Sequence, residues 1–200
     1  MAINLIKGQK IDLRKKDGKK LTSFCVGANW GVIEKSGFFG AKKVSVDLDL
    51  SVGLFDEHKE LVDIVYFNNL DARGIKHSGD DLVGDENGDD GLDNEVIEVN
   101  LDHLSSNVEQ VVFVLNSYKG QDFATIPFAS IRLYEGEMDK VTDIVATYNI
   151  AKDEKFADHV SMILGKLYKE NGSWKFSAIG EAVKDKDFEE TFNTVQNNFL

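Results

Sequence analysis

Apolar and polar residues alternate along most of the chain, a period of two that is typical of β-strands with one buried face. The alternation is clear around Ile11 and Leu13 and again over residues 44–51. Asp17-Gly18 and Asn171-Gly172 are strong hairpin signals. Further strand-like runs follow at 61–67, 96–101, 129–134, 143–150, 159–168 and 173–179. The pattern predicts an all-β protein, an antiparallel β-sandwich of about ten strands.

Two segments depart from this alternation. Residues 111–116 read VVFVLN, a continuous apolar run that predicts a central strand buried on both faces. From Asp185 onward the apolar spacing becomes helical, which predicts a C-terminal amphipathic helix packed on one sheet, with Asp185 or Asp187 as its N-cap. The apolar stripe consists of Phe188, Phe192, Val195 and Phe199. Without internal repeats or a linker, residues 1–200 are expected to form a single domain.

Composition narrows the class of protein. The N-terminus has no signal-peptide pattern and the sequence has no apolar run of about 18 residues, so we expect a cytoplasmic protein without a direct membrane span. The single Cys25 lies in an apolar stretch, where a buried structural thiol is expected rather than a nucleophile. A basic footprint for nucleic acid is absent, which disfavours binding to DNA or RNA.

The net charge of −12 is concentrated in one segment, residues 79–95, which reads GDDLVGDENGDDGLDNE. It contains eight carboxylates and four glycines, with no Lys or Arg, and the rest of the chain is nearly balanced with 27 acidic and 23 basic residues. Such a segment is either a solvated spacer or a loop built around a cation. The interspersed glycines and amides favour the cation.

The chemistry of this loop suits calcium. Calcium takes six to eight oxygen ligands and tolerates irregular geometry, and the segment offers carboxylates, amides and carbonyls but no cysteine. An EF-hand starting at Asp85 fails, because its sixth position is Asp90 rather than Gly and its twelfth is Val96 rather than Glu. We therefore predict an acidic metal-binding loop of another kind.

Ligands from elsewhere can join this loop. Asp47 and Asp49 alternate with apolar residues and share one strand face, which is either part of the site or an ordinary solvated sheet surface. Asn68 and Asn69 end a predicted strand near the entrance of the loop and offer neutral oxygens.

The sequence resembles the TerD family of tellurium-resistance and general stress proteins over nearly its whole length. The resemblance is carried by SVDLDLSVGLFDE (45–57), VYFNNLDARGIKHSGDDLVGDENGDD (65–90), EVIEVNL (95–101) and LYKENGSWKFSAIGEA (167–182). The segments GFFGAKK (37–43) and NSYKGQDFATI (116–126) are most similar to the TerZ branch.

The resemblance implies a calcium-binding β-sandwich of the cytoplasm, without known catalytic activity, that binds two calcium ions. It also implies action through partners, namely other stress-resistance proteins and membrane-associated complexes. Here GLDN separates Asp89 and Asp90 from Glu95, so either Asp89 and Asp90 or Asp93 and Glu95 fill the family's ligand roles. Together, the residues and the resemblance give the candidate metal ligands Asp47, Asp49, Asn68, Asn69, Asp80, Asp81, Asp85, Asp89, Asp90, Asp93 and Glu95.

A second hypothesis is a metal-dependent hydrolase, in which the acidic loop holds an ion that activates water. That enzyme needs a general base, for which His77 beside the loop is the candidate. We expect a non-catalytic protein instead, because the remaining histidines are scattered and no phosphate-binding or dinucleotide motif is present.

Overall fold

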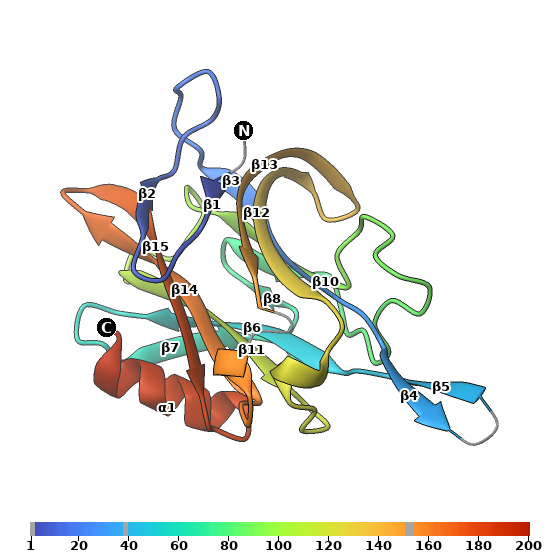
Figure 1. Cartoon of the computed structure of the whole chain (residues 1–200). Helices are drawn as coiled ribbons and strands as arrows, with labels where there is room; N and C mark the ends of the chain where they lie inside the picture. Colours follow the sequence, from blue (N-terminus) through green and yellow to red (C-terminus); the bar gives the residue numbers. More distant parts are fainter. Residues whose placement is uncertain (1–2, 38–39, 151–153) are drawn as a thin grey trace.

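The computed structural model describes residues 3–37, 40–150 and 154–200, in which two β-sheets face one another (Figure 1). The first sheet has the order β1 (Ile3–Asn4), β13 (Lys140–Asn149), β12 (Ala129–Glu137), β3 (Ser23–Trp30), β10 (Glu95–Asn100), β9 (Ile75–His77) and β8 (Asp71–Ala72). The second has the order β2 (Lys10–Asp12), β15 (Ser173–Val183), β14 (Ser161–Glu170), β11 (Gln110–Ser117), β6 (Leu48–Phe55) and β7 (Leu61–Val65). The strand pairs are antiparallel except β1 with β13. The predicted antiparallel sandwich is confirmed.

Smaller elements lie outside the two sheets. The strands β4 (Ile33–Gly37) and β5 (Gly40–Val44) form a hairpin that projects from the body of the molecule (Figure 1). Residues 38–39 of the GFFGAKK segment lie outside the described residues. Two short 3-10 helices, η1 (Phe123–Thr125) and η2 (Glu154–Phe156), precede the helix α1 (Phe188–Asn198). Among the described residues, no helix is long and apolar enough to cross a membrane.

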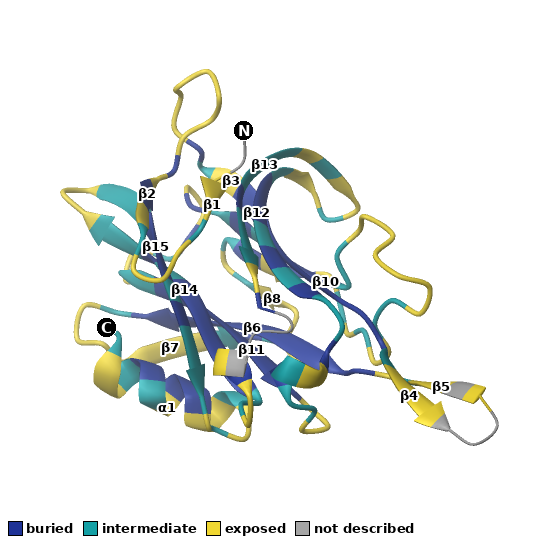
Figure 2. Ribbon diagram, in the orientation of Figure 1, coloured by how far each residue is buried: buried dark blue, intermediate teal, exposed yellow. Residues whose placement is uncertain are grey.

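The central strands of the second sheet, β6 and β11, are buried on both faces. The inner face of this sheet meets the first sheet in the main core, and its outer face packs against α1 through Phe55, Val114, Phe192 and Val195. Figure 2 shows β6 and nearly all of β11 as buried ribbons, while α1 has one buried face. Asp187 caps the helix by accepting a hydrogen bond from the Glu190 amide at 2.9 Å. The central buried strand and the C-terminal amphipathic helix are therefore both confirmed.

The predicted strand over residues 44–51 is wrong in its bounds. Val44 ends β5, residues 45–47 are not in a strand, and β6 begins at Leu48. The backbone of residues 45–47 forms hydrogen bonds with segments other than a neighbouring strand. Trp30 Nε1 donates to the Val46 carbonyl at 2.9 Å, and the Val46 amide donates to the Val83 carbonyl at 2.9 Å. The Asp47 carbonyl accepts from the Tyr118 amide, so this stretch joins three segments instead of extending a ladder.

The acidic loop connects two paired strands, β9 and β10, over residues 78–94 (the green segment at the right of Figure 1). It folds back over the end of β3, where the Asp85 amide donates to the Trp30 carbonyl and the Asn94 amide to the Ala28 carbonyl, both at 2.9 Å. The Asn94 side chain accepts from the Trp30 amide at 2.8 Å. These contacts hold the middle of the loop and its C-terminal end against the first sheet.

Candidate metal centre

The acidic loop is anchored to β6 at Leu50, where β7 has not yet begun to pair with that strand. Glu95 Oε2 accepts from the Leu50 amide at 2.7 Å, and His77 Nε2 lies 2.9 Å from the Leu50 carbonyl. The His77 Nδ1 atom accepts from the Gly79 amide, so Nε2 carries the hydrogen that Leu50 receives. The buried side chains of His77 and Glu95, both from the first sheet, thus make the backbone hydrogen bonds to Leu50 that a neighbouring strand would make. They join the two sheets at this point.

Asp47, Asp49 and Asp80 form the first carboxylate group, in which one oxygen of each lies within 4.8 Å of the others. Asp47 and Asp49 are only 2% and 4% exposed, so the sheet-surface interpretation is excluded. Lys119 Nζ lies 3.0 Å from Asp47 Oδ2, whereas the buried Asp47 Oδ1 has no hydrogen-bond partner among the described residues. The group therefore contains a buried oxygen without a hydrogen-bond partner among the described residues.

Burial and crowding raise the pKa values of Asp49 and Asp80 in this group. Burial, together with the charges of Glu95, Asp47 and Asp80, raises the pKa of Asp49 from 3.8 to about 7. Burial also raises the pKa of Asp80, with Asp47 as the next cause, and burial raises the pKa of Glu95 against its hydrogen bond with His77. A positive ion among these carboxylates would favour their charged forms.

Asp85, Asp89 and Asp90 form a second carboxylate group at the tip of the loop. Gly88 and Gly91, with φ near +90°, provide the left-handed turns that bring these three side chains together. Asp85 Oδ2 accepts from the Asp90 amide at 3.2 Å, and burial raises the pKa of Asp85. This group is more exposed than the first.

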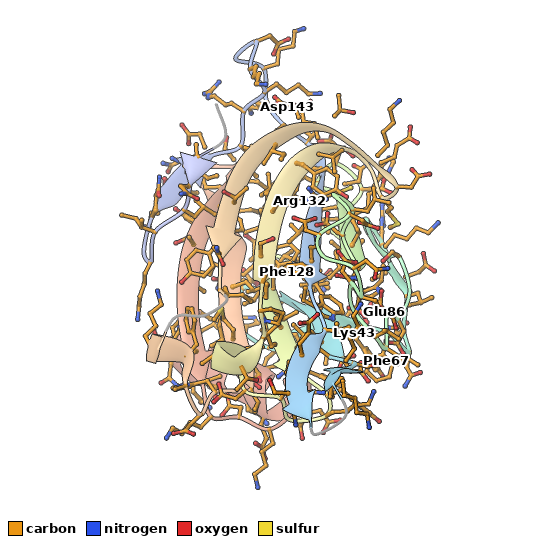
Figure 3. All side chains as sticks on the ribbon, turned by 45° about the vertical axis from the view of Figure 1, so that its right-hand side comes forward. Lys43, Phe67, Glu86, Phe128, Arg132 and Asp143 are labelled. Carbon is orange, nitrogen blue, oxygen red and sulfur yellow. The ribbon has the colours of Figure 1, made fainter. Side chains whose placement is uncertain are left out.

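The hairpin of β4 and β5 supports the tip of the loop from outside. Lys43 Nζ donates to the Glu86 carbonyl at 2.6 Å and to Asn87 Oδ1 at 3.1 Å. Figure 3 shows Lys43 beside Glu86. Glu86 itself is exposed and belongs to neither carboxylate group.

Asn94 links Asp81 to Asp85 of the second group, a role that could not be assigned from the sequence. Its Nδ2 atom donates to Asp81 Oδ2 at 3.1 Å and to Asp85 Oδ1 at 3.2 Å. Asp81 also accepts from the Val83 and Gly84 amides through Oδ1, so it shapes the loop by local hydrogen bonds. The presence of asparagine side chains in the loop is the sequence signal for this role.

Two further candidate ligands, Asp93 and Glu95, are bound by other residues of the protein. Asp93 is paired with Arg132, whose Nε lies 2.9 Å from Asp93 Oδ2, and Glu95 binds the Leu50 amide as described above. Asp89 and Asp90, the other alternative for the family's ligand roles, are grouped with Asp85, although Asp89 Oδ1 also accepts from Asn29 Nδ2 at 2.9 Å.

Asn68 and Asn69 lie in an exposed turn after β7. The predicted strand 61–67 ends at Val65, because Tyr66 and Asn69 hydrogen-bond to each other through their backbones. The Asn69 side chain donates to the Ile64 carbonyl at 2.6 Å. The turn follows the edge strand of the second sheet.

The donor set fits a hard divalent cation. Both groups offer carboxylate oxygens alone, a chemistry that suits calcium and disfavours zinc or copper. Asp47 Oδ1 has no hydrogen-bond partner among the described residues, so it is available to bind an ion in the first group. His77, the base required by the hydrolase hypothesis, is buried with both ring nitrogens engaged by the backbone.

Comparison with known proteins gives a consistent result. The family model described as the TerD domain matches residues 1–193. The stress response protein SCP2 of Bacillus subtilis (strain 168) is 35% identical over 95% of this chain and 97% of its own length. The tellurium resistance protein TerZ of Serratia marcescens is 30% identical over 96% of each chain.

A solved structure shares the fold. It is a homologue of the telluride resistance protein TerD from Streptomyces coelicolor A3(2), with a TM-score of 0.61 and 17% sequence identity. The alignment covers 84% of this chain and 94% of the other. At this identity the likeness supports the fold alone.

Proposed function

Because the chain belongs to the TerD family, we propose that it is a non-catalytic calcium-binding protein of tellurite resistance and the general stress response. The observation that carries calcium binding is the first carboxylate group, with two buried aspartates and an unpartnered oxygen. One ion belongs to Asp47, Asp49 and Asp80, and a second to Asp85, Asp89 and Asp90. Each ion would supply positive charge that offsets carboxylate repulsion and orders the loop.

The protective action would run through other proteins in the cytoplasm rather than through chemistry on tellurite. Oxyanion reduction needs an accessible thiolate or a redox cofactor, whereas Cys25 is fully buried and burial raises the pKa of its thiol to about 11. The proposed partners are other stress-resistance proteins, including membrane-associated complexes.

Calcium is expected to stabilise the protein against urea. A ligand that binds only the folded state at a hundredfold excess over its Kd adds about 2.7 kcal/mol to the free energy of unfolding. Urea titrations in calcium, in magnesium and in chelator measure this, and magnesium should stabilise less because it demands octahedral geometry and keeps its waters. Coincident unfolding curves in calcium and chelator would contradict the proposed function.

Calcium affinity is expected to fall as the pH is lowered through 7. The ion requires the charged form of Asp49, whose pKa burial raises to about 7, so binding below that pH must release a proton. For this one group the limiting loss is about tenfold per pH unit. Competition with a calibrated chelator at several pH values measures the slope, and a constant affinity through this window would exclude Asp49 as a ligand.

The second ion is tested by Asp90→Asn, with Glu86→Gln as a matched control from the same tip. We expect Asp90→Asn to weaken one of two binding steps by about tenfold, or about 1.4 kcal/mol, and to leave the other unchanged. Glu86→Gln should alter both steps little, because Glu86 lies outside the group. Calorimetric titration resolves the steps, and the reverse order of effects would place the ion elsewhere.

A further inference from the structure

Asn116 connects the first carboxylate group to helix α1. It lies on β11 directly opposite Asp49 of β6, and cross-strand neighbours in an antiparallel pair project from the same face of the sheet. This is the face that α1 covers, since Asn116 Nδ2 donates to Thr191 Oγ1 of the helix at 3.0 Å. Asn116 is the first residue of the segment NSYKGQDFATI, which the proposed metal groups do not include.

The orientation of the Asn116 amide is fixed by its neighbours. Ser161 Oγ donates its hydrogen to the Asp185 carbonyl at 2.6 Å, and Thr191 Oγ1 donates to the Asp187 carbonyl at 2.7 Å. Both hydroxyl oxygens are therefore acceptors towards Asn116, and only Nδ2 can satisfy them, at 2.6 Å and 3.0 Å. The Oδ1 atom therefore takes part in neither of these two hydrogen bonds.

That oxygen is buried and unsatisfied. Asn116 is 3% exposed, and its Oδ1 has no hydrogen-bond partner among the described residues. Asn116 and Asp49 line the same pocket of about 140 Å³, whose walls include Phe67 and Phe188. Leaving a buried amide oxygen without a partner is unfavourable, so a cation or a donor is expected beside it.

We propose that Asn116 Oδ1 is a neutral oxygen ligand for the cation of Asp47, Asp49 and Asp80, and that through its Nδ2 it couples this cation to the docking of α1. The inference rests on the proposed calcium binding. A cation that holds Oδ1 also holds the amide against Ser161 and Thr191. By linkage, the factor by which calcium favours docking of the helix equals the factor by which docking of the helix favours calcium binding.

Calorimetric titration with calcium chloride tests the ligand role. We expect Asn116→Ala to weaken the first binding step by about tenfold, and Asn116→Asp to retain it, because aspartate restores an oxygen at the same place. Asn193→Ala, on the exposed side of α1, is the matched control and should bind as the wild type does. Equal affinities for wild type and Asn116→Ala would overturn the inference alone, whereas a wild type that binds no calcium would overturn the proposed function as well.

Amide hydrogen exchange of α1 tests the coupling. Calcium should slow exchange of the helix amides in the wild type, and should do so less in Asn116→Asp, whose carboxylate cannot donate to Ser161 and Thr191. This variant also serves if Asn116→Ala does not fold. Equal slowing of the helix by calcium in wild type and Asn116→Asp would show that Asn116 does not transmit the effect.

Discussion

Asp49→Asn is expected to weaken calcium binding at the first group by about a hundredfold, or about 2.8 kcal/mol. The same substitution is expected to stabilise the metal-free protein. Both effects have one cause, since Asp49 is buried among other carboxylates, and its charge is unfavourable without an ion and favourable with one. Opposite signs in calcium and in chelator distinguish a metal ligand from a residue that only supports the fold.

The stabilisation in chelator depends on pH with a definite sign. The pKa of Asp49 is about 7 in the folded protein and near 3.8 when unfolded, so between these values only the folded state binds the proton. Wild-type stability from this group therefore falls as the pH rises from about 4 to about 7. The advantage of Asp49→Asn should be largest at about pH 8 and should shrink at about pH 5.5.

Urea unfolding and calcium titration of the same samples measure both effects. Asp63→Asn on β7 is the control, because Asp63 is exposed and its side chain accepts a hydrogen bond from the neighbouring Ile64 amide. If Asp49→Asn bound calcium as the wild type does and lost stability in chelator, the first group would not be a metal site.

Glu95→Ala is expected to lower the free energy of unfolding by about 3 kcal/mol, because it leaves buried donors without an acceptor and opens a cavity. Glu95 is fully buried and accepts from the Leu50 and Asp81 amides. Glu95→Gln keeps an acceptor oxygen and should cost much less. Glu98→Ala, from the opposite face of β10, is the control for loss of an acidic side chain.

Urea titration in chelator separates this structural role from ligation. A large loss of stability for Glu95→Ala without metal is the expected result. If Glu95→Ala were as stable as the wild type in chelator but bound calcium far more weakly, Glu95 would be a ligand rather than an anchor.

The parts of the fold that follow local periodicity could be predicted from the sequence. The buried strand around Val112, the amphipathic helix and its N-cap at Asp187 depend on spacing and on contacts within a few residues. The break between β5 and β6 could not, because it depends on Trp30, which binds the Val46 carbonyl from another strand.

The same difference between local patterns and distant contacts applies to the candidate site. The sequence located the acidic loop and Asp49, but the roles of its carboxylates are set by distant partners. Asp93 meets Arg132, 39 positions away, and Glu95 meets Leu50, 45 positions away. In the printed sequence Asp93 and Asp90 are equivalent carboxylates, and only the folded chain separates the ion-paired one from the clustered one.

The position of the acidic loop within a hairpin has an evolutionary consequence. Because β9 and β10 are neighbours, residues 78–94 start and finish side by side, whatever the length of chain between them. Doubling the length of such a loop costs only about 0.6 kcal/mol in closure entropy. The length of this loop can therefore change while Glu95 keeps its bond to Leu50. Ion number and affinity can diverge among relatives while the sandwich beneath stays the same.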